Sequence, residues 1–224
     1  MKLRHLTSPI AALVMLLTGC GGGFMYKDLP VSKGNAVAGT GHTITFQGSP
    51  LTLDGTPITV GDHIRDATLA ATDLTLVSLG DSKGRVRIVS VVPSLDTTVC
   101  EQQTHYLSEK NANLDQDAQL MTVSMDTPFA QKRFAESAQI ANVTFLSDYQ
   151  GGDFGKAHGL LVPSMRVLAR SVMVLDKNNV VRYLQIVPEM ASMPDMEAAF
   201  HAARKAAGLP MPLPPLGSMG GFTY

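Results

Sequence analysis

The chain has 224 residues, of which 45% are apolar, which is enough for one sizeable hydrophobic core with tails. The formal net charge is −1, and the acidic and basic residues are scattered, without the blocks of Lys and Arg typical of nucleic-acid binding. The six histidines stand singly, and none sits at metal-ligand spacing to another histidine or to a cysteine. We therefore expect neither a built-in metal site nor a nucleic-acid partner.

The first residues have the pattern of a secretion signal. Lys2 and Arg4 precede an apolar run over 10–17 that is too short to span a bilayer. The run ends in Leu-Thr-Gly-Cys20, which resembles the bacterial lipobox, and this resemblance implies cleavage before Cys20 and lipid attachment to its sulfur. Residues 1–19 are then a lipoprotein signal peptide. An ordinary signal with an incidental Cys20 is the alternative.

Two stretches flank the expected domain. Residues 20–41 contain several glycines and no apolar periodicity, so we expect a lipid anchor followed by a flexible, disordered spacer. Residues 208–224 are rich in Pro and Gly and uncharged, which predicts a tail rather than a helix or core segment. One domain over 42–207 lies between them, without an internal repeat.

The domain begins with strand-favouring residues. Runs at 43–46 and 51–53, separated by Gly48-Ser49-Pro50, predict a β-hairpin. The continuous apolar run within 85–92 predicts a strand that is covered on both faces and ends at Pro93.

Helices and strands then alternate. Residues 98–111 suit a helix with Asp96 or Thr97 as its cap, and 120–125 read as the next buried strand. Further elements are a helix beginning at Thr127-Pro128 and ending near 137, a hairpin over 171–175 and 180–186, and a helix over 196–206 that starts behind Ser192 and Pro194. This order predicts an α/β thioredoxin-like fold, with a central mixed sheet flanked by helices and an added N-terminal β-hairpin.

Cys100 is the residue best placed for chemistry. A lone cysteine is commonly just a small buried apolar residue. Cys100, however, lies in the first turn of the helix predicted after the buried strand, where unpaired backbone N–H groups and the helix dipole favour a thiolate. It has no CxxC partner, because residue 97 is Thr and residue 103 is Gln, which argues against a disulfide reductase or isomerase.

Three segments carry a family resemblance. VVPSLDTTVC, ending at Cys100, contains the peroxiredoxin motif PxxxTxxC; MDTPFAQKRF covers 125–134, and ARSVMVLD covers 169–176. Together they resemble the thiol peroxidase subfamily of bacterial peroxiredoxins, over roughly residues 42–207. The N-terminal hairpin is also typical of that subfamily.

The resemblance implies a role for each matching residue. Cys100 is the expected peroxidatic cysteine, Thr97 its hydroxyl partner, Pro93 the residue that shields the thiolate, and Arg170 the cationic partner. Each also has a structural alternative. Thr97 could only cap a helix, Pro93 could only end a strand, and Arg170 could be a solvated charge.

One position departs from the family. The subfamily usually has a resolving cysteine after the phenylalanine of the FAQxRF segment, and this chain has Ala135 there. The usual intramolecular disulfide therefore cannot form, which predicts a 1-Cys cycle with an external thiol as reductant. Cys20 could replace the resolving cysteine only if it escapes lipidation.

These observations lead us to expect an enzyme that reduces hydrogen peroxide and small organic hydroperoxides, without metal, flavin or haem. The alternatives are a lipid-anchored thiol redox sensor or relay, and an inactive scaffold lipoprotein. We expect the bacterial cell envelope as its location, anchored by lipid and facing the periplasm. Gly21 after Cys20 resembles outer-membrane lipoproteins. The resemblance also makes a homodimer the default.

Overall fold

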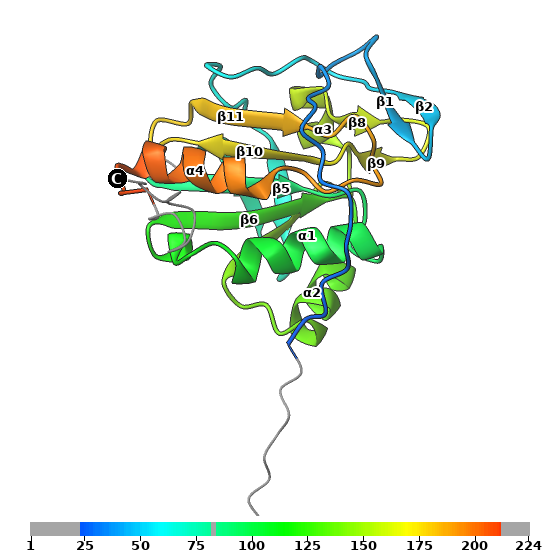
Figure 1. Cartoon of the computed structure of the whole chain (residues 1–224). Coiled ribbons are helices and arrows are strands. Elements are labelled where there is room, and N and C mark those ends of the chain that lie inside the picture. Colours follow the sequence, from blue (N-terminus) through cyan, green and yellow to red (C-terminus); the bar gives the residue numbers. More distant parts are fainter. Residues whose placement is uncertain (1–22, 82–83, 212–224) are drawn as a thin grey trace, which may run out of the picture.

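A seven-stranded mixed sheet forms the centre of the computed structural model, which describes residues 23–81 and 84–211 (Figure 1). Its strands are β3 (Thr68–Ala71), β4 (Leu76–Ser78), β5 (Val86–Val91), β6 (Ala118–Ser124), β7 (Val143–Ser147), β10 (Ser171–Leu175) and β11 (Val181–Ile186). They are ordered β11-β10-β5-β6-β7-β3-β4. The pairs β5–β6 and β6–β7 are parallel, and the other pairs of this sheet are antiparallel. The predicted signal peptide, Cys20 and most of the predicted tail lie outside the described residues.

Helices and smaller elements cover the two faces of the sheet (Figure 1). One face carries three helices, α1 (Thr98–Glu109), α2 (Pro128–Ser137) and α4 (Met196–Ala207). The other carries a hairpin of β1 (Thr43–Phe46) and β2 (Ser49–Thr52), the short helix α3 (Asp153–His158), and the strand pair β8 (Leu161–Val162) and β9 (Val167–Leu168). Single-turn helices cover Leu79–Asp81 and Leu114–Gln116. The predicted fold class is confirmed.

Strand β5 is buried at every residue, as its apolar run predicts. Val86 and Ile88 pack under the helices, whereas Val89 and Val91 pack on the hairpin side. Successive side chains of a strand point to opposite faces, so a strand covered on both faces needs an apolar residue at almost every position. This buried strand leads directly into the helix that carries Cys100.

Both predicted hairpins form, with one change in the first. Its turn is Gln47-Gly48, both at positive φ, and Ser49 and Pro50 belong to β2. Positive φ at both central residues matches the twist of the flanking strands. The last predicted helix, over 196–206, is confirmed as α4, and its N-cap is Asp195, whose carboxylate accepts from the Ala198 amide.

The segment expected to be a disordered spacer differs from that prediction where it is described, over 23–41. Its backbone follows the domain, and the Lys27 amide and carbonyl both bond to the Gln102 side chain of α1. Further along, Ala36 N donates to Ile186 O, and Ala38 is buried. The segment has few apolar residues, but its backbone N–H and C=O groups are paired with the domain, which orders it.

No helix within residues 23–81 and 84–211 is both long enough and apolar enough to cross a membrane. Such a crossing needs about 20 consecutive apolar residues. The helices described here have 12 residues at most.

His158, at the end of α3, is fully buried and neutral. Its Nε2 accepts from the Arg65 amide at 3.2 Å, so Nδ1 carries the hydrogen and donates to the Phe154 carbonyl at 2.8 Å. Burial lowers the pKa of His158 from 6.5 to about 4, and the nearby charge of Arg65 adds to this effect. The folded state therefore resists protonation of this ring.

We predict that His158 contributes to loss of stability in acid. Between pH 6.5 and about 4 the unfolded chain binds a proton that the folded chain does not. The free energy of unfolding therefore decreases as the pH is lowered from 6.5 to about 4. The gap corresponds to about 3 kcal/mol. Urea unfolding at the two ends of the window should show this loss, and His158→Gln should lack that part of it. An equal decline in both proteins would contradict the prediction.

Candidate active site

Cys100 is the third residue of α1 and is fully buried. In the first turn of a helix the backbone N–H groups have no partner within the helix, and their dipoles favour a negative charge nearby. Thr97 precedes the helix as its N-cap residue in an extended conformation, and its carbonyl accepts from the Glu101 amide. The predicted placement of the thiol at a helix N-terminus is thus confirmed.

The guanidinium of Arg170 lies against the sulfur. Its Nη2 donates to Cys100 Sγ at 3.3 Å, and the arginine side chain is itself buried, with 2% of the residue exposed. Its Nε donates to the Met190 carbonyl at 2.8 Å and its Nη1 to Gln103 Oε1 at 2.8 Å. A buried guanidinium held in this way stabilises a thiolate much more than a solvated one would.

The sheet explains why residues 70 positions apart in the sequence meet. Strand β10 pairs antiparallel with β5, and Ser171 lies opposite Val91 at the end of β5. Arg170 immediately precedes Ser171, so it lies where β5 gives way to the loop before α1. The alternative reading of Arg170 as a solvated surface charge is wrong, because the residue is buried.

Gln103 is a site residue that the sequence analysis missed. Its amide oxygen accepts from Arg170, and its amide nitrogen donates to Ser90 Oγ at 2.8 Å. It lies three residues after Cys100, and residues at this spacing share one face of a helix. The signal available in the sequence was a polar residue at that spacing from Cys100.

The loop between β5 and α1 is held by Asp126, which follows β6. The carboxylate accepts from the Ser94 hydroxyl at 2.8 Å and from the Leu95 amide at 2.8 Å. Pro93, in this loop, is buried. Asp126 thus fixes the path of the chain into the helix of the thiol, and it belongs to the MDTPFAQKRF segment.

Thr97 is nearby but does not touch the sulfur. Its side chain is exposed, and its hydroxyl donates to the Ser94 carbonyl at 3.0 Å rather than to Cys100. It occupies the N-cap position, yet its side chain makes no capping hydrogen bond, so the capping alternative is wrong. The structure brings Cys100 and Arg170 into contact and leaves the Thr97 hydroxyl facing solvent at the start of the helix.

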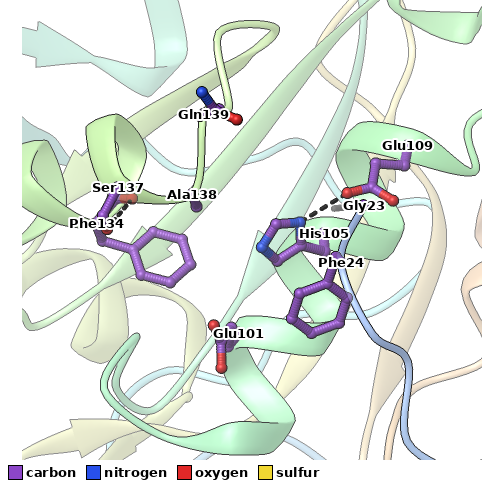
Figure 2. Close-up of a pocket in the computed structure, with 9 residues that line it drawn as sticks. All are labelled: Gly23, Phe24, Glu101, His105, Glu109, Phe134, Ser137, Ala138 and Gln139. Atoms are coloured by element: carbon purple, nitrogen blue, oxygen red, sulfur yellow. Dashed lines mark hydrogen bonds and ion pairs between the residues drawn. The ribbon is translucent and has the colours of Figure 1, made fainter. Parts of the chain in front are cut away.

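A separate cavity of about 530 Å³ lies between α1, the end of α2 and the N-terminal segment (Figure 2). His105 lies in its wall, with Nδ1 bonded to Glu109 at 2.8 Å and its ring stacked on Phe24. Neither Cys100 nor Arg170 lines this cavity. It adjoins the helix of the thiol without opening onto the sulfur.

The described residues contain no cluster of three His, Cys, Asp or Glu side chains placed to hold a metal ion. Cys100 offers a buried sulfur in contact with a fixed cation at a helix N-terminus. In its thiolate form a cysteine sulfur is a nucleophile.

The chain is similar to known enzymes along most of its length. The Redoxin family model matches residues 59–200. The thiol peroxidase of Halalkalibacterium halodurans is 46% identical over 164 residues, which are 73% of this chain and 98% of that protein. The chain belongs to the thiol peroxidase family. The thiol peroxidase of Oceanobacillus iheyensis is 41% identical over 162 residues, 72% of this chain and 98% of that protein.

Solved structures agree with this assignment. The crystal structure of a peroxiredoxin-like protein from Aquifex aeolicus is 36% identical, with a TM-score of 0.70, and covers 77% of this chain and 99% of that one. The protein is thus an enzyme of the peroxiredoxin type. In this thiol peroxidase family member the thiol and the guanidinium lie in contact at the end of β5.

We predict that Gln103→Leu slows the reaction of Cys100 with hydrogen peroxide roughly tenfold, because Arg170 loses one of its orienting acceptors. The unfolding free energy should fall by about 1–3 kcal/mol, since two buried polar groups lose their partner. Gln102→Leu, on the same helix as Gln103, is the matched control. It removes two hydrogen bonds to the Lys27 backbone but none to Arg170. Equal rates in the two variants would contradict the role of Gln103.

Proposed function

We propose that the chain is a 1-Cys thiol peroxidase, which reduces hydrogen peroxide and small organic hydroperoxides through a sulfenic acid on Cys100. The observation that carries this proposal is the 3.3 Å contact between Arg170 Nη2 and Cys100 Sγ in a buried site at a helix N-terminus. A cation in contact with the sulfur and the dipole at a helix N-terminus both favour the thiolate, the reactive form.

The first step transfers two electrons from sulfur to peroxide. The thiolate of Cys100 attacks one peroxide oxygen, an S–O bond forms, and the O–O bond breaks. The other oxygen leaves with the bonding pair as hydroxide or alkoxide and takes up a proton. Cys100 is left as a sulfenic acid. Because negative charge moves from sulfur toward the leaving oxygen, Arg170 is placed to stabilise both ends of this shift.

Thr97 and Pro93 complete the proposed site. The exposed hydroxyl of Thr97 lies at the start of the helix, where it can bond to an entering peroxide. Pro93 is buried in the loop that leads into α1, and its proposed part is to shield the thiolate. Neither residue carries a charge, so their part is orientation and exclusion of solvent.

An external thiol closes the proposed cycle. Position 135, on α2, is alanine, and the chain contains only two cysteines, Cys20 and Cys100. A thiolate of the reductant attacks the sulfur of the sulfenic acid and displaces hydroxide, which takes up a proton as water, and a mixed disulfide forms. A second thiol then attacks the reductant's sulfur, displaces Cys100 as a thiolate and forms the disulfide of the reductant. A redox relay would instead pass the oxidation of Cys100 to a partner protein without efficient turnover.

We also propose lipid attachment at Cys20 and a location in the bacterial cell envelope, on the periplasmic side. The support is the basic start of the chain, the short apolar run and the Leu-Thr-Gly-Cys20 sequence. Stable attachment needs more than one acyl chain, because one chain binds membranes only marginally. A homodimer is part of this proposal through the family alone.

The peroxidase proposal is tested with the full chain purified in detergent. Limiting hydrogen peroxide is added, and sulfenic acid on Cys100 is followed by rapid quenching and mass spectrometry. We expect fast, stoichiometric oxidation that is slowed by about 10²-fold in Arg170→Ala, since one preorganised donor is lost. A thiol added in excess should then restore the free Cys100 and sustain turnover.

Two outcomes would change the conclusion. If Cys100 reacts no faster than a free cysteine and Arg170→Ala makes no difference, the peroxidase proposal is overturned in favour of a scaffold lipoprotein. If oxidation is fast but no thiol sustains turnover, the relay explains the site better. Lys132→Ala, on the exposed side of α2, is the control for removal of a positive charge.

The anchor is tested separately. We expect the intact mass of the chain from bacterial membranes to correspond to a polypeptide that begins at Cys20 and carries acyl chains. Cys20→Ser should move the chain into the soluble fraction of the envelope. A mature chain that begins elsewhere, or an unmodified Cys20, would contradict lipid attachment without affecting the peroxidase proposal.

A further inference from the structure

We infer that Glu189 is a positioning residue for the reaction of Cys100, acting through the N-terminal hairpin and the carbonyl that orients Arg170. Glu189 lies in the loop between β11 and α4, far from the sulfur in sequence, and it does not contact Cys100 or Arg170. The inference rests on the proposed peroxidase chemistry at Cys100 and identifies a residue that neither the family motifs nor the contacts of the sulfur include.

The carboxylate of Glu189 binds the turn of the hairpin. Oε1 accepts from the Gln47 amide at 2.9 Å, and Oε2 accepts from the Gly48 amide at 3.1 Å and from the Thr45 hydroxyl at 2.8 Å. Gln47 and Gly48 have positive φ, so their amides point together in the tight turn. One carboxylate thereby ties β1 and its turn to the loop after β11.

The same loop carries the acceptor of Arg170. The Met190 amide donates to the Thr45 carbonyl at 2.8 Å, and the Thr45 amide donates to the Pro188 carbonyl at 2.7 Å. Thr45 of β1 thus binds the residues before and after Glu189. These bonds hold the Met190 carbonyl at the position where it accepts from Arg170 Nε at 2.8 Å. Figure 1 shows the hairpin at the end of the sheet where α1 begins.

The arrangement is directional because a guanidinium is planar. Fixing Nε on one side by the Met190 carbonyl and Nη1 by Gln103 leaves Nη2 aimed at the sulfur. A shift of the Met190 carbonyl would rotate the plane and move the Nη2 hydrogen away from Cys100. Displacements of about 1 Å at such contacts can cost up to about 10²-fold in rate.

The electrostatics of Glu189 agree with this arrangement. Burial alone would raise its pKa, but bonds from the Ala191 and Gln47 amides, the Thr45 hydroxyl and the Gly48 amide outweigh burial and lower the pKa from 4.5 to about 2. The residue is therefore ionised at neutral pH, which is the form that can accept four hydrogen bonds.

The test compares Glu189→Gln with a matched control, both in the full chain purified in detergent. The glutamine amide presents donors to backbone N–H groups, so we expect the turn to move and Cys100 oxidation by hydrogen peroxide to slow by roughly tenfold or more. Asp195→Asn is the control. It also replaces a carboxylate that accepts from a backbone amide, at the start of α4, but it touches neither the hairpin nor Arg170.

A second measurement does not depend on activity. The Nε–H proton of Arg170 is hydrogen-bonded and buried, so its nuclear magnetic resonance signal should exchange slowly with solvent in the wild type and in Asp195→Asn. We expect fast exchange in Glu189→Gln. In an Arg170→Ala background, Glu189→Gln should cause no further loss of oxidation rate, whereas a general loss of stability would still add to it.

The outcomes separate this inference from the proposed function. An equally fast oxidation and an equally protected Arg170 signal in Glu189→Gln would overturn the positioning role, and so would equal slowing in Asp195→Asn. A wild type that reacts no faster than free cysteine would overturn the peroxidase proposal, while the exchange measurement still decides the Glu189 contact. If Glu189→Gln does not fold, Thr45→Val removes one bond to the carboxylate, and a rate unchanged in that variant overturns the inference.

Discussion

The burial of the Arg170 guanidinium is the constraint on which the site depends. A charge removed from water costs several kcal/mol unless hydrogen bonds and an opposite charge compensate it. Three acceptors from different parts of the chain meet this need, namely the Cys100 sulfur from α1, the Gln103 amide from the same helix and the Met190 carbonyl from the loop after β11. The Cys100 sulfur is thus one of three groups that hold the guanidinium in place, and the geometry of the site follows from that burial.

Local signals were sufficient to predict the elements around the thiol. The apolar run of β5 and the cap-like residues before α1 predicted a buried strand followed by a helix, because a short continuous apolar run that stops at a proline suits a strand covered on both faces. The hairpin of β10 and β11 also followed from its turn residues. Once these elements are antiparallel neighbours, Arg170 and Cys100 lie at the same end of the sheet. The motifs supplied the pairing that periodicity alone does not give.

Other parts had no readable signal before folding. Strands β3 and β4 are short, and Leu76 in β4 is exposed, so neither shows a clear alternation. The segment over 23–41 is ordered by backbone hydrogen bonds, which composition does not reveal. The Met190 carbonyl is a main-chain group, and any residue type could supply it. The role of Glu189 could not be predicted from the sequence either, because its partners are mostly backbone amides of a turn distant in the chain.

In the proposed cycle, oxidation changes the electrostatic balance that holds the site together. The sulfenic acid is neutral, so Arg170 keeps its charge while the sulfur loses its own. The guanidinium then keeps its Gln103 and Met190 acceptors but faces a neutral sulfur, so its burial costs more in the oxidised site. Because position 135 is alanine, the proposed reductant is an external thiol, and it has to reach a sulfur that is fully buried in the structure.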